Sequence, residues 1–66
     1  MTVSTYVVTV ECIGSTDAPD FAKRRARADG FRVRTVKRVH PAAGFDGNPK
    51  VRGPWVVELA VSRSGG

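Results

Sequence analysis

The sequence predicts a small α+β domain with the element order β-α-β-β, folded as a two-layer sandwich in which one helix covers one face of a three-stranded sheet. Three segments rich in valine, threonine and aromatic residues have the composition of strands, and one segment between the first two has helical spacing. With 66 residues the chain is long enough for one domain. We therefore expect a single α+β domain over residues 1–63 and a frayed C-terminal tail over residues 64–66.

The first strand is expected over residues 2–13, TVSTYVVTVECI. Branched and aromatic side chains pack well on a pleated surface, which is why valine, threonine and tyrosine favour strands. Successive side chains alternate between the two faces of a strand. One face would carry Tyr6, Val8, Val10 and Cys12, and the other Val3, Thr5, Val7, Thr9 and Glu11.

The helix is expected from about Ala18 to Asp29. Asp17 can cap its N-terminus, and Pro19 fits its first turn. Gly30 follows at the position where a residue with positive φ commonly ends a helix. The residues expected to face inward are Ala18, Phe21, Ala22, Ala26, Ala28 and the stem of Arg25. The residues expected to face water, as a secondary basic face, are Lys23, Arg24 and Arg27.

The second strand is expected over residues 31–39, FRVRTVKRV, where polar and apolar residues alternate. Strict alternation places on the inner face Phe31, Val33, Thr35, Lys37 and Val39. It places on the outer face Arg32, Arg34, Val36, Arg38 and His40. This strand should therefore be half-buried, with a basic outer side.

Residues 41–53, PAAGFDGNPKVRG, are rich in glycine and proline and are expected to form a long exposed hairpin loop. The third strand is expected over residues 54–62, PWVVELAVS. Its inward residues would be Trp55, Val57, Leu59 and Val61, and its outward residues Val56, Glu58 and Ala60.

Two sheet orders are compatible with these elements. A right-handed crossover makes the first two strands parallel, and the last two form an antiparallel hairpin, so we expect a three-stranded mixed sheet. The third strand can insert between the other two, giving the order 1-3-2, or follow them, giving 1-2-3. We prefer 1-3-2, because the third strand is the most evenly hydrophobic and central strands have that pattern. This split βαβ arrangement resembles half of a ferredoxin-like fold.

A second subunit is expected to complete the core. A chain of this length buries only about 60% of its unfolded surface, so its core is marginal. Cys12 is the sole cysteine and His40 the sole histidine, so a disulfide or a Cys/His zinc site would need another chain. We expect a homodimer that pairs the free edge of the first strand or stacks the open sheet faces. We expect no metal and no cofactor.

The basic residues are concentrated in one part of the chain. Eight of the eleven lie in residues 23–40, where Asp29 is the only acid. Clustered positive charge attracts phosphates and steers association, so the expected partner is nucleic acid or an acidic protein surface. The residues expected to bind nucleic acid are Arg32, Arg34, Arg38, His40, Lys50 and Arg52. Phe45 is the best candidate for base stacking, and the scarcity of aromatics favours contacts to the backbone over sequence recognition.

Two other interpretations of the basic residues stay open. They can be solvated faces that keep a small protein soluble, with Glu58 and Glu11 pairing to Arg34 or Arg32 across strands. They can also form a protein-interaction module that modulates a host protein or self-assembles.

The sequence argues against several classes of function. No nucleophile, base and orienting residue stand in a recognisable spacing, and no phosphate-binding glycine loop occurs, so we expect no enzyme and no small-molecule substrate. No apolar run approaches the roughly 20 residues that span a bilayer, and no signal peptide is apparent, so we expect a cytoplasmic protein with no membrane partner. Eight arginines against three lysines, and the lack of glutamine, are typical of a GC-rich genome, such as that of an actinobacterium or one of its phages.

Overall fold

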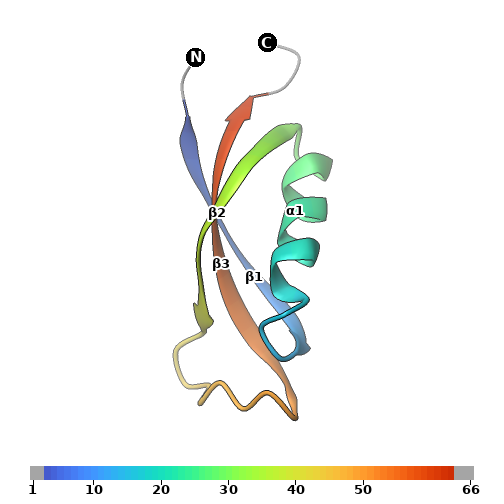
Figure 1. Cartoon of the computed structure of the whole chain (residues 1–66), viewed down its shortest axis with the longest axis vertical. Coiled ribbons are helices and arrows are strands. Elements are labelled where there is room, and N and C mark those ends of the chain that lie inside the picture. The colour runs from blue at the N-terminus through green and yellow to red at the C-terminus, as the bar shows by residue number, and fades with distance from the viewer. Residues whose placement is uncertain (1–2, 64–66) are drawn as a thin grey trace.

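A computed structural model describes residues 3–63. Its four elements are β1 (Ser4–Ile13), α1 (Ala18–Ala28), β2 (Phe31–Pro41) and β3 (Arg52–Arg63), in the predicted order β-α-β-β. The three strands form one sheet, and α1 packs across it as a second layer (Figure 1). The small α+β architecture with one helix is therefore confirmed. The tail predicted over residues 64–66 lies outside the described residues.

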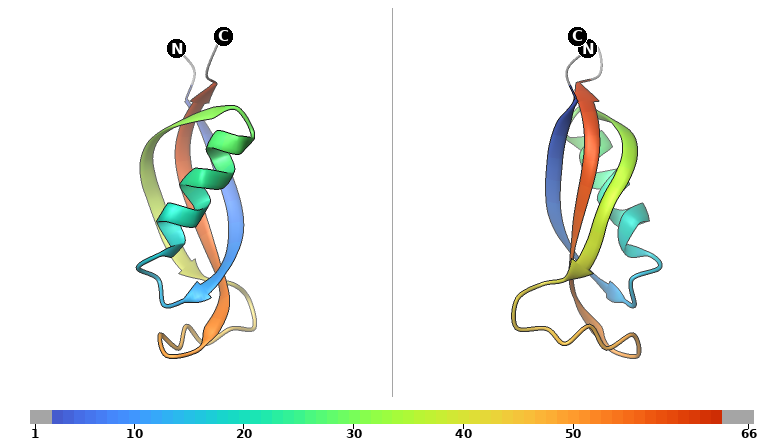
Figure 2. Two further views of the ribbon diagram at one scale, coloured as in Figure 1. Left: turned by 90° about the vertical axis from the view of Figure 1, so that its right-hand side faces the viewer. Right: turned by 60° about the vertical axis from the view of Figure 1, so that its left-hand side comes forward.

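β3 is the central strand of the sheet. The order is β1-β3-β2, as preferred from the sequence, and β3 pairs antiparallel with both neighbours. The prediction of a mixed sheet was wrong, because β1 and β2 run parallel to each other without being neighbours. Every hydrogen-bonded strand pair is therefore antiparallel. Figure 2 shows β3 between the other two strands and α1 on one side of the sheet.

The pairing of β1 with β3 is regular and defines two faces of the sheet. Ten residue pairs follow one another without a register shift. Tyr6 lies opposite Leu59 on the side that α1 covers, which we call the helix face. Val7 lies opposite Glu58 on the uncovered side, which we call the open face. The alternation predicted for these two strands is confirmed.

β2 carries two register shifts against β3 that strict alternation does not predict. One shift leaves Arg34 without an opposing residue on β3, and the other leaves Lys37 without one. A bulge adds one residue to a strand and so reverses the face to which the following residues point. The predicted faces of Thr35, Val36 and Lys37 are therefore wrong. Val36 lies on the helix face opposite Leu59, whereas Thr35 and Lys37 lie on the open face.

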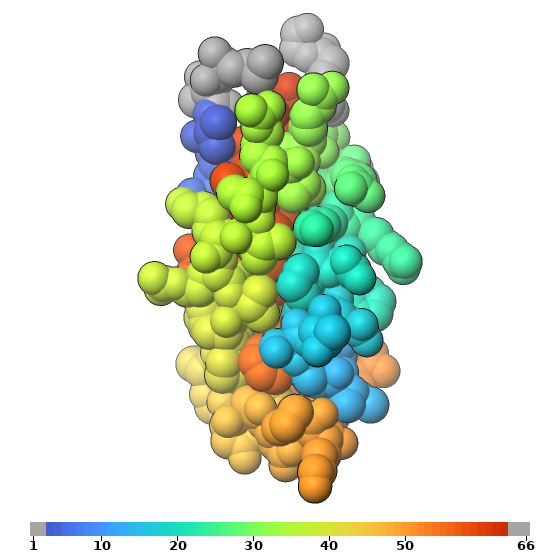
Figure 3. All heavy atoms as spheres, viewed as in Figure 1, coloured from blue at the N-terminus to red at the C-terminus, as the bar shows by residue number. Residues whose placement is uncertain are grey.

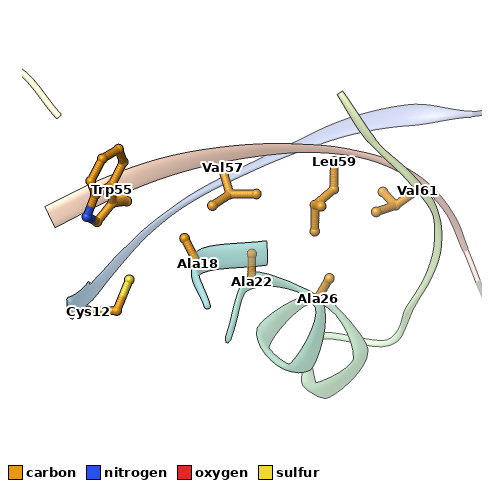
Figure 4. Packing of buried hydrophobic residues seen from close by; sticks show 8 residues of the cluster. All are labelled: Cys12, Ala18, Ala22, Ala26, Trp55, Val57, Leu59 and Val61. Carbon is orange, nitrogen blue, oxygen red and sulfur yellow. The ribbon is translucent and has the colours of Figure 1, made fainter. Parts of the chain in front are cut away.

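The core is formed by a row of alanines on α1 that packs against the helix face of β3 (Figure 4). Ala18, Ala22 and Ala26 are fully buried, and their small side chains let the helix approach the sheet closely. The largest fully buried side chains of the core are Val57, Leu59 and Val61. Phe21 and Ala28 were predicted to face inward, but both are exposed. Each lies off the alanine row, which repeats every four residues and sets the face that touches the sheet.

The ends of α1 agree with the sequence signals to within one residue. Asp17 occupies the N-cap position, although its side chain makes no capping hydrogen bond, and Pro19 lies in the first turn. Gly30 has a φ of 88°, and its N–H donates to the carbonyl oxygen of Arg27 at 3.0 Å. This left-handed conformation suits glycine, which therefore ends the helix. α1, the helix of residues 3–63, is too short and too polar to cross a membrane.

The long loop between β2 and β3 is tied to the core by Phe45. Its ring packs edge-on against Trp55, with centroids 5.6 Å apart and planes at 86°, and it lies over Gly53. The carboxylate of Asp46 and the side-chain oxygen of Asn48 each accept a hydrogen bond from the backbone N–H two residues ahead, at 3.0 and 2.9 Å. Such turns stabilise irregular backbone. Because Phe45 is half-buried in this packing, the base-stacking role considered for it loses support.

Candidate functional site

The structure distributes the basic residues over separate surfaces. The open face carries Arg32, Arg38, His40 and Arg52. Lys37 joins them, because its Nζ donates a hydrogen bond to Thr5 Oγ1 of β1 at 3.1 Å. Ala60 of β3 lies opposite Thr5, so the Lys37 side chain crosses the sheet above it. Ala60 is only 9% exposed although α1 does not cover this face, and the Lys37 side chain contributes to its burial.

Two glutamates partly neutralise the open face. Glu58 Oε2 lies 4.0 Å from Arg38 Nε and 3.7 Å from His40 Nε2. Glu11 Oε2 lies 4.0 Å from Arg52 Nε. These are long and partly or largely exposed pairs, and such pairs contribute only about 0–1 kcal/mol to stability. They nevertheless lower the positive potential that this face presents to an anion.

The second surface is a cleft between α1 and β2. Its volume is about 410 Å³, and it is lined by Lys23 and Arg27 of α1 and by residues 33–36 of β2. Arg34, the residue that the first bulge of β2 leaves without an opposing residue, belongs to this lining. Three cations from two elements therefore converge here, and none of the described residues that line the cleft is acidic. Figure 3 shows the face on which the side chains of α1 and β2 meet.

Arg34 was predicted to share a regular strand face with Arg32, whereas it sits in a bulge and lines the cleft. The sequence holds a signal for the bulges. Val33, Val36 and Val39 recur at every third position. Strict alternation places Val36 on the opposite face from Val33 and Val39. The two bulges bring all three valines to the helix face, where they pack against the core. A spacing of three in an apolar strand pattern is thus the available indication of the bulges.

The other predicted site residues lie apart from the cleft. Lys50 is exposed in the loop, close in sequence to Arg52 at the start of β3. Arg24 was predicted to share a face with Lys23 and Arg27, but it lies on the other flank of α1, where it lines a groove beside β1. The secondary basic face predicted on the helix is therefore split between two surfaces.

A further charged cluster joins β1 to the end of α1. The Tyr6 hydroxyl donates a hydrogen bond to Asp29 Oδ2. This hydrogen bond raises the pKa of Tyr6 above its ordinary value of 10.0, and burial and the charge of Asp29 act in the same direction, while Arg25 opposes them. Arg25 and Asp29 therefore interact with the same hydroxyl, and neither contributes to the cleft.

Cys12, near the end of β1, is a free and buried cysteine. Cys12 Sγ donates to the carbonyl oxygen of Gly14 at 3.2 Å, and burial is the main cause that raises the pKa of the thiol. A thiol with a raised pKa is a poor nucleophile, so this side chain is suited to packing. Residues 3–63 contain no group of three or more His, Cys, Asp or Glu side chains placed to hold a metal ion, and we assign no metal ligand.

Comparisons with protein-family models, with curated proteins and with solved structures find no match for this chain. The function is therefore inferred from the geometry and the charges alone. The cleft offers three cationic donors from Lys23, Arg27 and Arg34. Such a set can bind an anion, and phosphate oxygens suit it well.

Proposed function

We propose that the protein binds nucleic acid through the phosphate backbone, and that the cleft between α1 and β2 is the primary contact. The proposal is carried by the convergence of Lys23, Arg27 and Arg34 on a cleft whose described lining contains no acidic residue. Cations held close together repel one another. A phosphate that enters the cleft relieves this repulsion and accepts charge-assisted hydrogen bonds.

The arrangement supports contact to the backbone rather than to the bases. Arginine presents a planar fork of donors that matches phosphate oxygens. Proteins that hold single strands add aromatic side chains on which bases stack. Here Phe45 is half-buried against Trp55, and the Tyr6 hydroxyl is engaged by Asp29. We therefore propose binding with little sequence preference.

The open face supplies a second, weaker contact in this proposal. Arg32 has no carboxylate within ion-pair distance among residues 3–63. Arg38, His40 and Arg52 lie near two glutamates, and Lys50 extends the surface along the loop. A phosphate can displace exposed ion pairs at little cost, because these pairs contribute little to stability.

Two charge-matched double variants separate the surfaces. Arg27→Glu with Arg34→Glu reverses the cleft, and Arg38→Glu with Arg52→Glu reverses the open face. Each replaces two positive charges with two negative ones, so the formal net charge falls from +5 to +1 in both. We expect the cleft variant to bind a labelled DNA oligonucleotide on the order of tenfold more weakly than the open-face variant, as a difference of about 1.4 kcal/mol. Fluorescence anisotropy at low salt measures this.

Two results would contradict the proposal. Equal weakening by both variants, with circular dichroism showing both folded, would mean that net charge alone decides binding. No detectable binding of the unmodified protein to DNA or RNA at low salt would remove nucleic acid as the partner.

A protein-interaction module is the second candidate, and the unprotected edge of β1 described below favours it. Such a module would bind the acidic surface of another protein. It would either modulate a host protein or assemble with itself. We also propose, from the composition, a cytoplasmic, non-enzymatic accessory protein of a phage or an actinobacterium. The split βαβ order of the strands supports the half-ferredoxin-like description of the fold.

A further inference from the structure

The outer edge of β1 is long, regular and unprotected. β1 pairs with β3 over ten residues without a bulge, and no other strand of residues 3–63 lies on its opposite side. The strand contains no lysine, arginine or proline, which are residues that commonly block pairing between sheet edges. Such an edge is a template for a further strand.

β2, the other edge strand, has the opposite properties. Its two bulges fall at Arg34 and Lys37, and it ends in Pro41. Bulges, basic side chains and proline all hinder the addition of a strand. The contrast between the two edges directs further pairing to β1.

Exposed apolar side chains also gather along β1. The large apolar side chains exposed among the described residues are Val3, Val7, Ile13, Phe21 and Val51. Two lie on β1 and one directly before it, and Phe21 of α1 lines the groove beside it. Val7 and Ile13 lie on the open face of β1, and Phe21 lies on its helix side, so a strand added at this edge would meet apolar side chains on both faces.

The groove between α1 and β1 continues this edge. It has a volume of about 790 Å³ and is lined by residues 8–13 of β1 and by one flank of α1. Its charged lining residues are Glu11, Asp17, Arg24, Arg25 and Arg52. The groove therefore carries both negative and positive charges. In a second copy related by a twofold axis, the acidic residues can lie opposite the basic residues of the first. A partner of a single charge sign would match this lining less well.

The chain is slightly less compact than the average for its size. Its radius of gyration is 12.2 Å, against about 11 Å for a compact chain of this length. Its accessible surface is 4521 Å², against about 4,100 Å² for a monomer of this mass. The helix contributes only alanines to the fully buried core. A second copy would add apolar contacts to this small core.

We propose that β1 pairs antiparallel with β1 of a second copy to form a six-stranded sheet with both helices on one face. Directly opposed residues of antiparallel strands lie on the same face, so the twofold axis is perpendicular to the sheet. The half-buried row of Tyr6, Val8 and Val10 then meets its counterpart, and the two Phe21 rings approach each other across the joined grooves. Ten paired residues would form about ten inter-strand hydrogen bonds.

The dimer would place both α1–β2 clefts at the outer ends of one sheet. Five strand spacings separate the two copies of β2, a width of about 24 Å. Both clefts lie on the helix side, so one nucleic acid can reach both and is held more tightly by the second contact. This consequence rests on the proposed function, whereas the dimer itself does not.

Sedimentation equilibrium of the whole chain at high micromolar concentration tests the dimer. We expect a mass of twice 7.1 kDa. Val7→Lys places a charge on the exposed edge beside Glu58, which can pair with it, and should shift the mass towards 7.1 kDa. Val51→Lys makes the same change in the exposed loop and should leave the dimer intact.

Amide hydrogen exchange gives a readout that needs no variant. The alternate β1 amides that point away from β3 should be protected, and their protection should fall on dilution. A mass of 7.1 kDa for the unmodified chain, equal masses for the two variants, or fast exchange along the outer edge of β1 would overturn the proposal. None of these readouts uses nucleic acid, so failure of the dimer is distinct from failure of the proposed binding.

Discussion

Gly53 positions the long loop by lacking a side chain. A Cβ at this position would lie closer than 3.0 Å to three ring atoms of Phe45, which itself packs against Trp55. The Phe45 ring therefore occupies the space that a side chain at residue 53 would fill, and this packing holds the loop against the core. Sequence patterns indicate the loop but not the contact of Phe45 with Gly53, because that contact depends on how the hairpin folds back.

Gly53→Ala should therefore destabilise the protein by about 1–3 kcal/mol, the usual cost of overpacking. The same substitution in a Phe45→Ala background should cost much less, because the obstructing ring is gone. Urea denaturation of the four proteins forms a double-mutant cycle that measures this coupling. Additive effects of the two substitutions would contradict the contact.

Because of the hydrogen bond from Tyr6 to Asp29, the free energy of unfolding should vary with pH in the alkaline range. It raises the folded-state pKa of Tyr6 above 10.0. A raised folded pKa adds stability that is complete below the unfolded pKa and is lost as the pH rises through the folded pKa. Tyr6→Phe should therefore be less stable than the unmodified protein near neutral pH, by at most about 1 kcal/mol because the pair is exposed.

This difference should shrink as the pH rises above 10.0, the ordinary pKa of the hydroxyl in the unfolded chain, and through the higher folded-state pKa. Urea denaturation of both proteins across this pH range checks the prediction, and Tyr6→Phe controls for the titration of lysines. A stability difference that stays constant above pH 10 would show that the hydroxyl contributes no such linkage.

At the scale of the elements, α1 depends on the small size of its buried row. Ala22 is fully buried against the sheet, whereas Ala28 is exposed on the same helix. Ala22→Leu should cost about 1–3 kcal/mol, because the added methyl groups force the layers apart. Ala28→Leu should be nearly neutral, since leucine is a good helix former. Thermal denaturation compares them, and equal losses would contradict the packing described for α1.

The sequence predicts β1, α1 and β3 well because their signals are local. Regular pairing preserves the alternation of β1 and β3, and Pro19 and Gly30 mark the ends of the helix. Phe21 was misplaced because the alanine row, rather than the larger ring, faces the sheet. A small residue can determine the buried face when two layers approach closely.

β2 was predicted less well because bulges depend on the partner strand. Strict alternation assigned Arg34 to the open face, whereas it lies in the first bulge and lines the cleft with Lys23 and Arg27. The candidate site therefore follows from a backbone irregularity that only the spacing of the β2 valines indicates. The same bulges account for the placement of Lys37 above Ala60.

For the whole molecule, the distribution of charge is more informative than its total of +5. The basic residues of 23–40 are neighbours in the sequence, but the fold divides them among the open face, the α1–β2 cleft and the groove beside β1. Carboxylates accompany the cations on the first and third of these surfaces. In the cleft, none of Lys23, Arg27 and Arg34 lies within ion-pair distance of a carboxylate of the described residues.

The salt dependence of nucleic-acid binding reports how many phosphates the cleft contacts. The logarithm of the association constant should fall with the logarithm of the salt concentration by about 0.9 for each duplex phosphate contacted. Arg27→Glu with Arg34→Glu should reduce that slope by about 2, and Arg38→Glu with Arg52→Glu should reduce it by less than about 1. An unchanged slope for the cleft variant, or the same reduction in both variants, would contradict the assignment of the cleft as the primary contact.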